Sequence, residues 1–170
     1  MNKIKGIYAA SMSVINSDLS LNIEKTVDHA EKIIDQGCHG AAIFGSTGQA
    51  QLISISEKIN LLNQLIKSKY KDKYLIGTGL NSLNETINLM KVSSSLNFNN
   101  FLIMPPAYYK YGDKEVIEFY SRLVKASPDS RIILLIILLF FKNCSALELS
   151  LTRILTGVLN FFEIALINGR

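Results

Sequence analysis

The sequence predicts an α/β fold built around a parallel sheet. Short stretches that are apolar on both faces alternate with segments whose apolar residues recur at helical spacing. The stretches begin near residues 41, 74, 101 and 131, so that one strand and one helix take about 30 residues, as in βαβ units. Strands that are apolar on both faces are typical of parallel sheets. This spacing fits either an open doubly wound sheet or an arc of a barrel, and both place their sites at the carboxyl ends of the strands.

The first strand is expected within residues 4–10, and a helix follows it. Ser20 or Asn22 can cap this helix, because both side chains accept hydrogen bonds from free backbone N–H groups, and Gly37 ends it. A second strand is expected at residues 40–44, where small and apolar residues follow one another.

Two capping boxes mark the starts of the next two helices. Ser54 and Glu57 predict the first box, and Ser82 and Glu85 predict the second. A serine and a glutamate at this spacing can each accept a hydrogen bond from the other's backbone N–H group. The third strand is expected between the two helices, at residues 74–76.

The remaining elements follow the same alternation. A fourth strand is expected at residues 101–104, where two prolines stop it, and Asp113 opens the next helix. The apolar residues 132–141 indicate a further buried strand. Residues 145–159 are predicted as a helix, and residues 161–169 are the candidate sixth strand.

Composition restricts the class of protein. The chain has 170 residues, of which 48% are hydrophobic and 19% are charged, so we expect one domain with a buried core. Its two cysteines, Cys38 and Cys144, exclude a disulfide scaffold and cannot form a four-ligand zinc site by themselves. The net charge of +4 is modest, and the basic residues 67–73 are interpreted as a solvated helix end. No nucleic-acid partner is expected.

No membrane partner is expected either, because residues 132–141 make roughly half of a membrane-spanning helix. The N-terminus lacks the apolar region and cleavage site of a signal peptide, which predicts a cytoplasmic location. His29 and His39 have no second ligand at metal spacing, and the sequence has neither a P-loop nor a G-x-G-x-x-G motif. We therefore expect no metal and no cofactor.

Residues 45–49, with the sequence GSTGQ, follow the second expected strand. The glycines allow a close approach of the backbone and present N–H groups, while the hydroxyls of Ser46 and Thr47 donate without adding charge. This turn suits a small anion such as a carboxylate or a phosphate. The alternative is a glycine-rich turn that binds nothing.

Three tyrosines lie within residues 108–111, after the fourth strand and its two prolines. A tyrosine at a strand end can relay a proton or donate to a developing oxyanion. The alternative is amphipathic packing with the hydroxyl groups in water. Their position at a strand end favours a functional role.

Three segments together resemble one family. Residues 45–49 resemble the G-[TS]-T-G-E signature of the dihydrodipicolinate synthase and N-acetylneuraminate lyase family. Residues 77–81 (GTGLN) are similar to its G-T-G-x-N, and residues 104–109 (MPPAYY) resemble its P-[YF]-Y segment. The motifs occur in the right order, and the resemblance extends from about residue 4 to about residue 134.

The resemblance implies a (β/α)8 barrel, usually oligomeric, that binds pyruvate or another 2-oxo acid as a Schiff base and performs aldol addition or cleavage. Because a complete barrel takes about 250 residues, this chain would form an incomplete (β/α)8 TIM barrel of roughly five to six β/α units. By resemblance, Ser46, Thr47 and the backbone at Gly48 hold the carboxylate. Ser46 also stands at a proton-relay position, and Tyr108 matches a relay tyrosine that often enters from a neighbouring subunit.

Some departures from the family pattern lie within these motifs. Gln49 replaces the family's glutamate and removes a charge at the start of the next helix, and Ala107 replaces the usual aromatic residue. Asn97 stands where a helix-ending glycine is common. This change is mild, because asparagine tolerates the same left-handed conformation.

Other departures affect the chemistry itself. The fifth strand should end in Y-N-x-P, but Leu135 stands at the place of the tyrosine and has no transferable proton. The Schiff-base lysine should occur as G-x-K-[DE] on the sixth strand, and residues 161–169 contain no lysine. Lys142 follows Lys125 as the only later lysine, in a loop-like segment, whereas a catalytic amine must be desolvated and held on a rigid element.

The sequence thus predicts a single incomplete barrel domain over residues 1–170, with residues 1–134 family-like and residues 135–170 a divergent tail. One hypothesis is that the gene or its reading frame is damaged near codon 135, which re-sequencing of the locus and its transcripts would decide. Three functions stay open. They are an aldolase or lyase fold that is inactive alone, a barrel fragment that associates with itself or with a full-length homologue, and a small doubly wound anion-binding domain.

Overall fold

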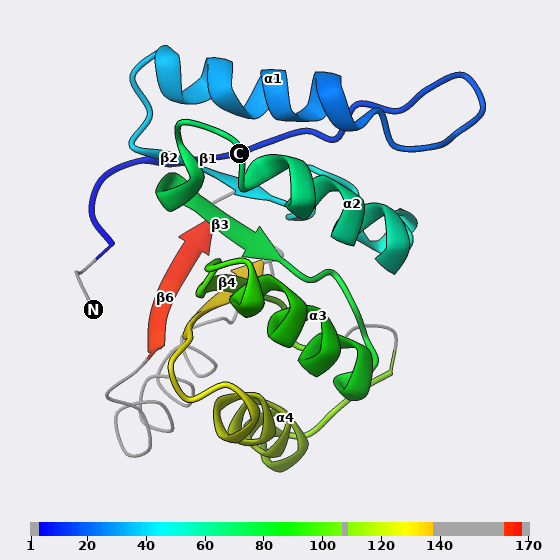
Figure 1. The fold of residues 1–170 in the computed structure, drawn as a ribbon. Coiled ribbons are helices and arrows are strands. Elements are labelled where there is room, and N and C mark those ends of the chain that lie inside the picture. Colours follow the sequence, from blue (N-terminus) through cyan, green and yellow to red (C-terminus); the bar gives the residue numbers. More distant parts are fainter. Residues whose placement is uncertain (1–3, 107–108, 138–161, 168–170) are drawn as a thin grey trace.

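Six parallel strands form one sheet in the computed structural model, which describes residues 4–106, 109–137 and 162–167 (Figure 1). The strands follow one another across the sheet in the order in which they occur along the chain. Each strand pairs in parallel with the next. They are β1 (Tyr8–Ala10), β2 (Gly40–Ile43), β3 (Tyr74–Gly77), β4 (Asn100–Ile103), β5 (Arg131–Ile137) and β6 (Phe162–Ile167).

Four helices connect the first five strands and follow one another along one side of the sheet (Figure 1). They bury apolar stripes at helical spacing, as in α2, where Leu61, Leu62 and Leu65 are fully buried. The helices are α1 (Ile23–Asp35), α2 (Ile55–Leu65), α3 (Leu83–Ser95) and α4 (Asp113–Ala126), with short 3-10 helices η1 (Ala50–Leu52) and η2 (Lys71–Lys73) in the connections.

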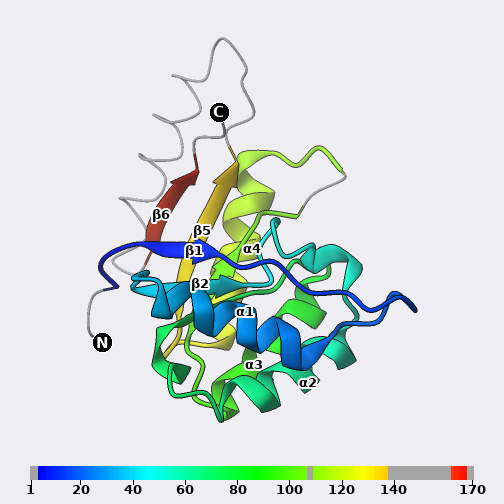
Figure 2. The same ribbon diagram turned by 90° about the horizontal axis from the view of Figure 1, so that it is seen from above.

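The strand order decides between the two sheets that the spacing allowed. A doubly wound sheet reverses its strand order at a switch point and keeps its first strand inside. In the described sheet the order runs from β1 to β6 without reversal, so β1 lies at an edge, and Figure 2 shows the last two strands, β5 and β6, side by side. The expected incomplete barrel is therefore confirmed, and the doubly wound alternative is wrong as a fold.

The two faces of the sheet carry separate apolar layers. The larger layer lies between the sheet and the helices and includes Ile43, Ile76, Phe101 and Ile103. The second layer takes one residue from each of four neighbouring strands, namely Ala42, Leu75, Leu102 and Ile133. Ala42 pairs with Leu75, and Leu102 pairs with Ile133 on one side and with Gly77 on the other, so the two pairs lie two residues apart along the strands. Such a layer is the inner packing of a barrel.

The helix starts follow the predicted caps with one correction. Ser54 and Glu57 form the complete capping box of α2, and Asn22, not Ser20, caps α1. At α3 only half of the predicted box is made, because Ser82 Oγ accepts from the Glu85 backbone without a reciprocal bond. The Glu85 carboxylate instead acts electrostatically on Lys58.

Several predictions fall outside the described residues. These are the relay tyrosine Tyr108, Ala107, Lys142 and the helix over residues 145–159. The candidate sixth strand is confirmed as β6. Within the described part of the chain, no helix has the length and apolar character needed to span a bilayer.

Candidate functional site

A cavity of about 450 Å³ lies at the carboxyl ends of β2, β3 and β4. Parallel strands bring the residues that follow each of them to this same end of the sheet. The wall is therefore assembled from segments that are far apart in the sequence. The lining residues are Phe44, Gly45, Ser46, Gln49, Ala50, Gln51, Leu52, Gly79, Leu102 and Met104.

The turn after β2 has an unusual backbone. Phe44 and Gln49 both adopt the left-handed conformation, with φ of 59° and 52°. A bulky residue at positive φ is an outlier, and such residues cluster at functional sites. The turn closes on itself, because the Gln49 N–H donates to the Ser46 carbonyl at 3.0 Å and the Ala50 N–H to the Gly45 carbonyl at 3.4 Å.

This closure leaves donors free at the apex of the turn. Among the described residues, the backbone N–H groups of Ser46, Thr47 and Gly48 meet no protein acceptor. Both hydroxyl-bearing side chains are exposed, whereas Gly48 is buried and its carbonyl accepts from Ser13 Oγ at 2.6 Å. Ser46 lines the cavity and Thr47 does not. The structure thus brings only one of the two predicted hydroxyl residues to the cavity wall.

The G-T-G segment after β3 packs tightly against this turn. A β-carbon at Gly77 would lie 2.1 Å from the Phe44 carbonyl oxygen. Gly79 has a φ of +59°, and a β-carbon there would lie 2.3 Å from that of Ala50. Only glycine fits these two positions, which explains why the strand end reads G-T-G.

Lys58 is a residue near the site that the sequence reasoning missed. Its side chain is fully buried on α2, and Nζ donates to the Thr78 carbonyl oxygen at 2.7 Å. Nζ also lies 5.9 Å from the centroid of the Phe44 ring. Burial lowers the pKa of Lys58 to about 8, and the charge of Glu85 opposes this shift. The signal was its spacing, because Lys58 lies three, four and seven residues before the buried leucines of α2.

The segment after β4 contributes Leu102 and Met104 to the cavity. Of the predicted tyrosine cluster, the structure describes Tyr109 and Tyr111, whose rings pack edge to face with centroids 6.4 Å apart. Tyr109 is 70% exposed. Neither of these tyrosines lines the cavity at the strand ends.

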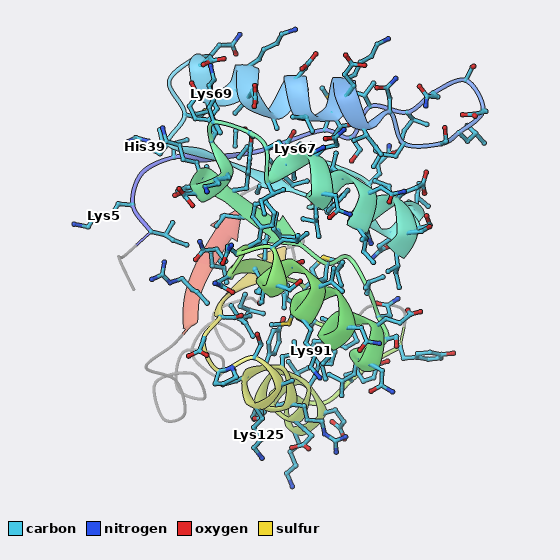
Figure 3. All side chains as sticks on the ribbon, viewed as in Figure 1. Lys5, His39, Lys67, Lys69, Lys91 and Lys125 are labelled. Carbon is cyan, nitrogen blue, oxygen red and sulfur yellow. The ribbon has the colours of Figure 1, made fainter. Side chains whose placement is uncertain are left out.

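In the described ranges, the other titratable side chains make structural contacts and do not form a metal-binding group. His39 Nδ1 accepts from the Ile7 N–H at 3.0 Å, and no group of three His, Cys, Asp or Glu side chains there could hold a metal ion. Lys69 and Lys73 lie together over the Tyr70 ring, with Nζ 4.7 and 5.0 Å from its centroid, whereas other described lysines lie elsewhere. Figure 3 shows Lys5, Lys69 and Lys125 at separate places, on the N-terminal segment, after α2 and on α4.

Comparison with known proteins identifies the family to which this site belongs. Residues 3–137 match the dihydrodipicolinate synthetase family, and this range includes both turns and the strands that carry them. The chain belongs to this family. The resemblance carried by the three motifs is therefore confirmed as family membership.

Individual relatives agree with this assignment. The chain is 28% identical over 137 residues to an uncharacterized DapA-like lyase of Chloroflexus aurantiacus, covering 79% of this chain and 46% of that protein. It aligns with Proteus mirabilis N-acetylneuraminate lyase with a TM-score of 0.81 at 20% identity, covering 99% of this chain and 57% of the lyase. A pyruvate complex of YagE, a dihydrodipicolinic acid synthase family protein of E. coli K12, aligns with a TM-score of 0.68 at 21% identity, covering 76% of this chain and 44% of YagE. The chain spans about half the length of the curated relatives it matches.

Proposed function

We propose that this chain binds the carboxylate of pyruvate or another 2-oxo acid at the carboxyl ends of β2, β3 and β4. The observation that carries the proposal is the turn after β2. There, three successive backbone N–H groups and the Ser46 hydroxyl have no acceptor among the described residues, and of these three residues Ser46 lines the cavity. Free N–H groups on a tight turn form a concave site for an anion. The pyruvate bound by the related YagE supports this ligand class.

The roles follow the family pattern. Ser46, Thr47 and the backbone at Gly48 hold the carboxylate oxygens, and Ser46 also stands at the relay position. Thr47 contributes through its N–H group, which meets no acceptor among the described residues, although Thr47 is not among the residues that line the cavity. Tyr108 is proposed as the second relay residue.

We further propose that the 170-residue polypeptide does not complete the reaction by itself. A Schiff base forms when a lysine amine attacks the keto carbon and water leaves. No lysine occurs in residues 161–169, and Leu135 stands at the place of the proton-transferring tyrosine. A carboxylate site alone binds ground and transition states equally and does not accelerate the chemistry.

Pyruvate titration followed by NMR tests the carboxylate site. Substitution Ser46→Ala removes one hydroxyl donor to a charged ligand, so pyruvate should bind about tenfold more weakly. Ser95→Ala is the matched control, because that hydroxyl is exposed at the far end of α3 and donates to the Val92 carbonyl. Equal pyruvate affinity of the two variants would contradict the assignment.

Borohydride trapping with pyruvate tests the chemistry. We expect no reduced pyruvyl adduct on any lysine by mass spectrometry. Lys58 is the lysine to inspect first, because its lowered pKa favours the reactive amine, although it does not line the cavity. An adduct on Lys58 or Lys142 would overturn the proposed inactivity.

A second candidate function is association of this barrel arc with another chain. The observation in its favour is that β1 and β6 are the edge strands of the described sheet. An unpaired strand edge is a template for pairing with another chain. The occupant proposed is a second copy or a full-length homologue, and sedimentation tests it.

A further inference from the structure

Lys58 places a buried positive charge close to the proposed carboxylate site. Its Nζ lies 5.9 Å from the ring of Phe44, which lines the cavity and directly precedes the turn that carries Ser46. The same Nζ donates to the carbonyl of Thr78, and the following residue, Gly79, also lines the cavity. The ammonium group therefore lies beside two of the three strand-end segments that form the cavity, those after β2 and β3.

This charge is not neutralised in its surroundings. Within the described ranges, no carboxylate lies within ion-pair distance of Lys58 Nζ, and Glu85 on α3 is the one titratable group whose charge acts on it. The hydroxyl of Thr78 is also buried without a partner. Buried charges are ordinarily paired because an unpaired charge is costly to desolvate. An anion bound at the adjacent turn would supply the missing negative charge.

We propose that Lys58 is a positioning residue that strengthens carboxylate binding at the turn after β2 by its charge, without touching the ligand. This inference rests on the proposed function and adds to it an electrostatic determinant on α2. The charge acts through an apolar region that includes the Phe44 ring, where Coulomb interactions are stronger than in water. Ligands with a negative charge are therefore favoured over neutral analogues of the same shape.

The test compares pyruvate affinity, measured by NMR titration, between pH 7 and pH 9 for the full chain and two variants. Because burial lowers the pKa of Lys58 to about 8, the wild-type charge is lost across this range, and pyruvate should bind about three- to tenfold more weakly at pH 9. Lys58→Met should bind weakly at both pH values. Lys58→Arg keeps its charge and should bind with unchanged affinity at both pH values.

Pyruvamide, which lacks the carboxylate charge, is the control ligand. Its affinity should be the same for all three proteins, and a parallel loss of pyruvamide affinity in Lys58→Met would assign Lys58 a structural role and overturn the inference. If circular dichroism shows that Lys58→Met does not fold, the dependence of pyruvate affinity on pH in the wild type and in Lys58→Arg still tests the inference. Pyruvate binding that is independent of pH in the wild type would overturn the role of Lys58 alone. Absence of pyruvate binding at every pH would overturn the proposed function as well.

Discussion

At Gly77 two strand ends approach each other more closely than any side chain permits. The Phe44 carbonyl oxygen occupies the place of a β-carbon, at 2.1 Å. Because that oxygen belongs to backbone, Gly77→Ala should lower the free energy of unfolding by about 3 kcal/mol, measured by urea denaturation. Gly45→Ala is the control, since its β-carbon would meet only Leu102 Cδ2, at 3.9 Å. Equal stability of the two variants would contradict the close approach.

The lowered pKa of Lys58 also predicts how the stability of the fold depends on pH. Its pKa is lowered from 10.5 to about 8 in the folded state, so above pH 8 the unfolded chain binds more protons than the folded one. The free energy of unfolding therefore rises with pH in this window, by about 2 kcal/mol between pH 7.5 and 9.5. Urea denaturation of the wild type against Lys58→Met isolates this contribution, because the tyrosines are common to both. The prediction would be wrong if the free energy of unfolding changed with pH in the same way in the wild type and in Lys58→Met.

At the scale of elements, Glu57 joins α2 to the segment before α1. Its carboxylate accepts from the backbone N–H groups of Ser54 at 3.1 Å and Leu21 at 2.8 Å. Glu57→Ala should therefore lower the free energy of unfolding by about 1 to 2 kcal/mol, as measured by thermal or urea denaturation. Glu24→Ala is the matched control, because Glu24 lies in the first turn of α1 and its side chain makes no hydrogen bond within the described residues.

The same hydrogen bonds predict that the contribution of Glu57 to stability depends on pH. Hydrogen bonds from Ser54 and from the Leu21 backbone hold the pKa of Glu57 below its ordinary value of 4.5. A carboxyl with a lowered folded-state pKa stabilises the fold above pH 4.5, and this contribution is lost as the pH falls through that lower pKa. The stability difference between the wild type and Glu57→Ala should therefore shrink below pH 4.5. A difference that is constant from pH 7 to pH 3 would contradict this.

The elements were predictable from the sequence where local chemistry decides them. The box at Ser54 and Glu57 is local, and so is the alternation of strands and helices. The box at Ser82 was half wrong, because Ser82 Oγ accepts from the Glu85 N–H while the Glu85 carboxylate makes no return bond to Ser82. The turn at residues 45–49 was predicted as an anion site from its glycines and hydroxyls. No sequence pattern indicated the left-handed backbone of Phe44, or that Ser46 lines the cavity while Thr47 does not.

At the scale of the whole molecule, the sheet is an arc with two edges. In the described part of the chain, β1 pairs with β2 alone, and β6 pairs with β5 alone. The spacing of strands could not distinguish this arc from a doubly wound sheet, because both use βαβ units of the same length. The family motifs distinguished them, since they occur at the ends of successive barrel strands. The inner layer of Ala42, Leu75, Leu102 and Ile133 is the physical counterpart of that assignment.

The edge at β1 leads to a prediction about association. Ile7 and Met12 flank this strand and are 68% and 54% exposed. An edge strand beside exposed apolar side chains favours pairing with another chain, because pairing satisfies backbone groups and buries apolar surface. We therefore expect the purified chain to sediment as a dimer or larger species.

Charge at the same edge should reverse this association, since lysine is the residue with which natural proteins protect exposed strand edges. The double variant Ile7→Lys and Met12→Lys should shift the sedimentation distribution toward monomer. Leu19→Lys is the control, because Leu19 is 84% exposed but lies in the connection between β1 and α1. A wild-type chain that is strictly monomeric at all concentrations would contradict association, and an equal response of the two variants would show that β1 is not the contact.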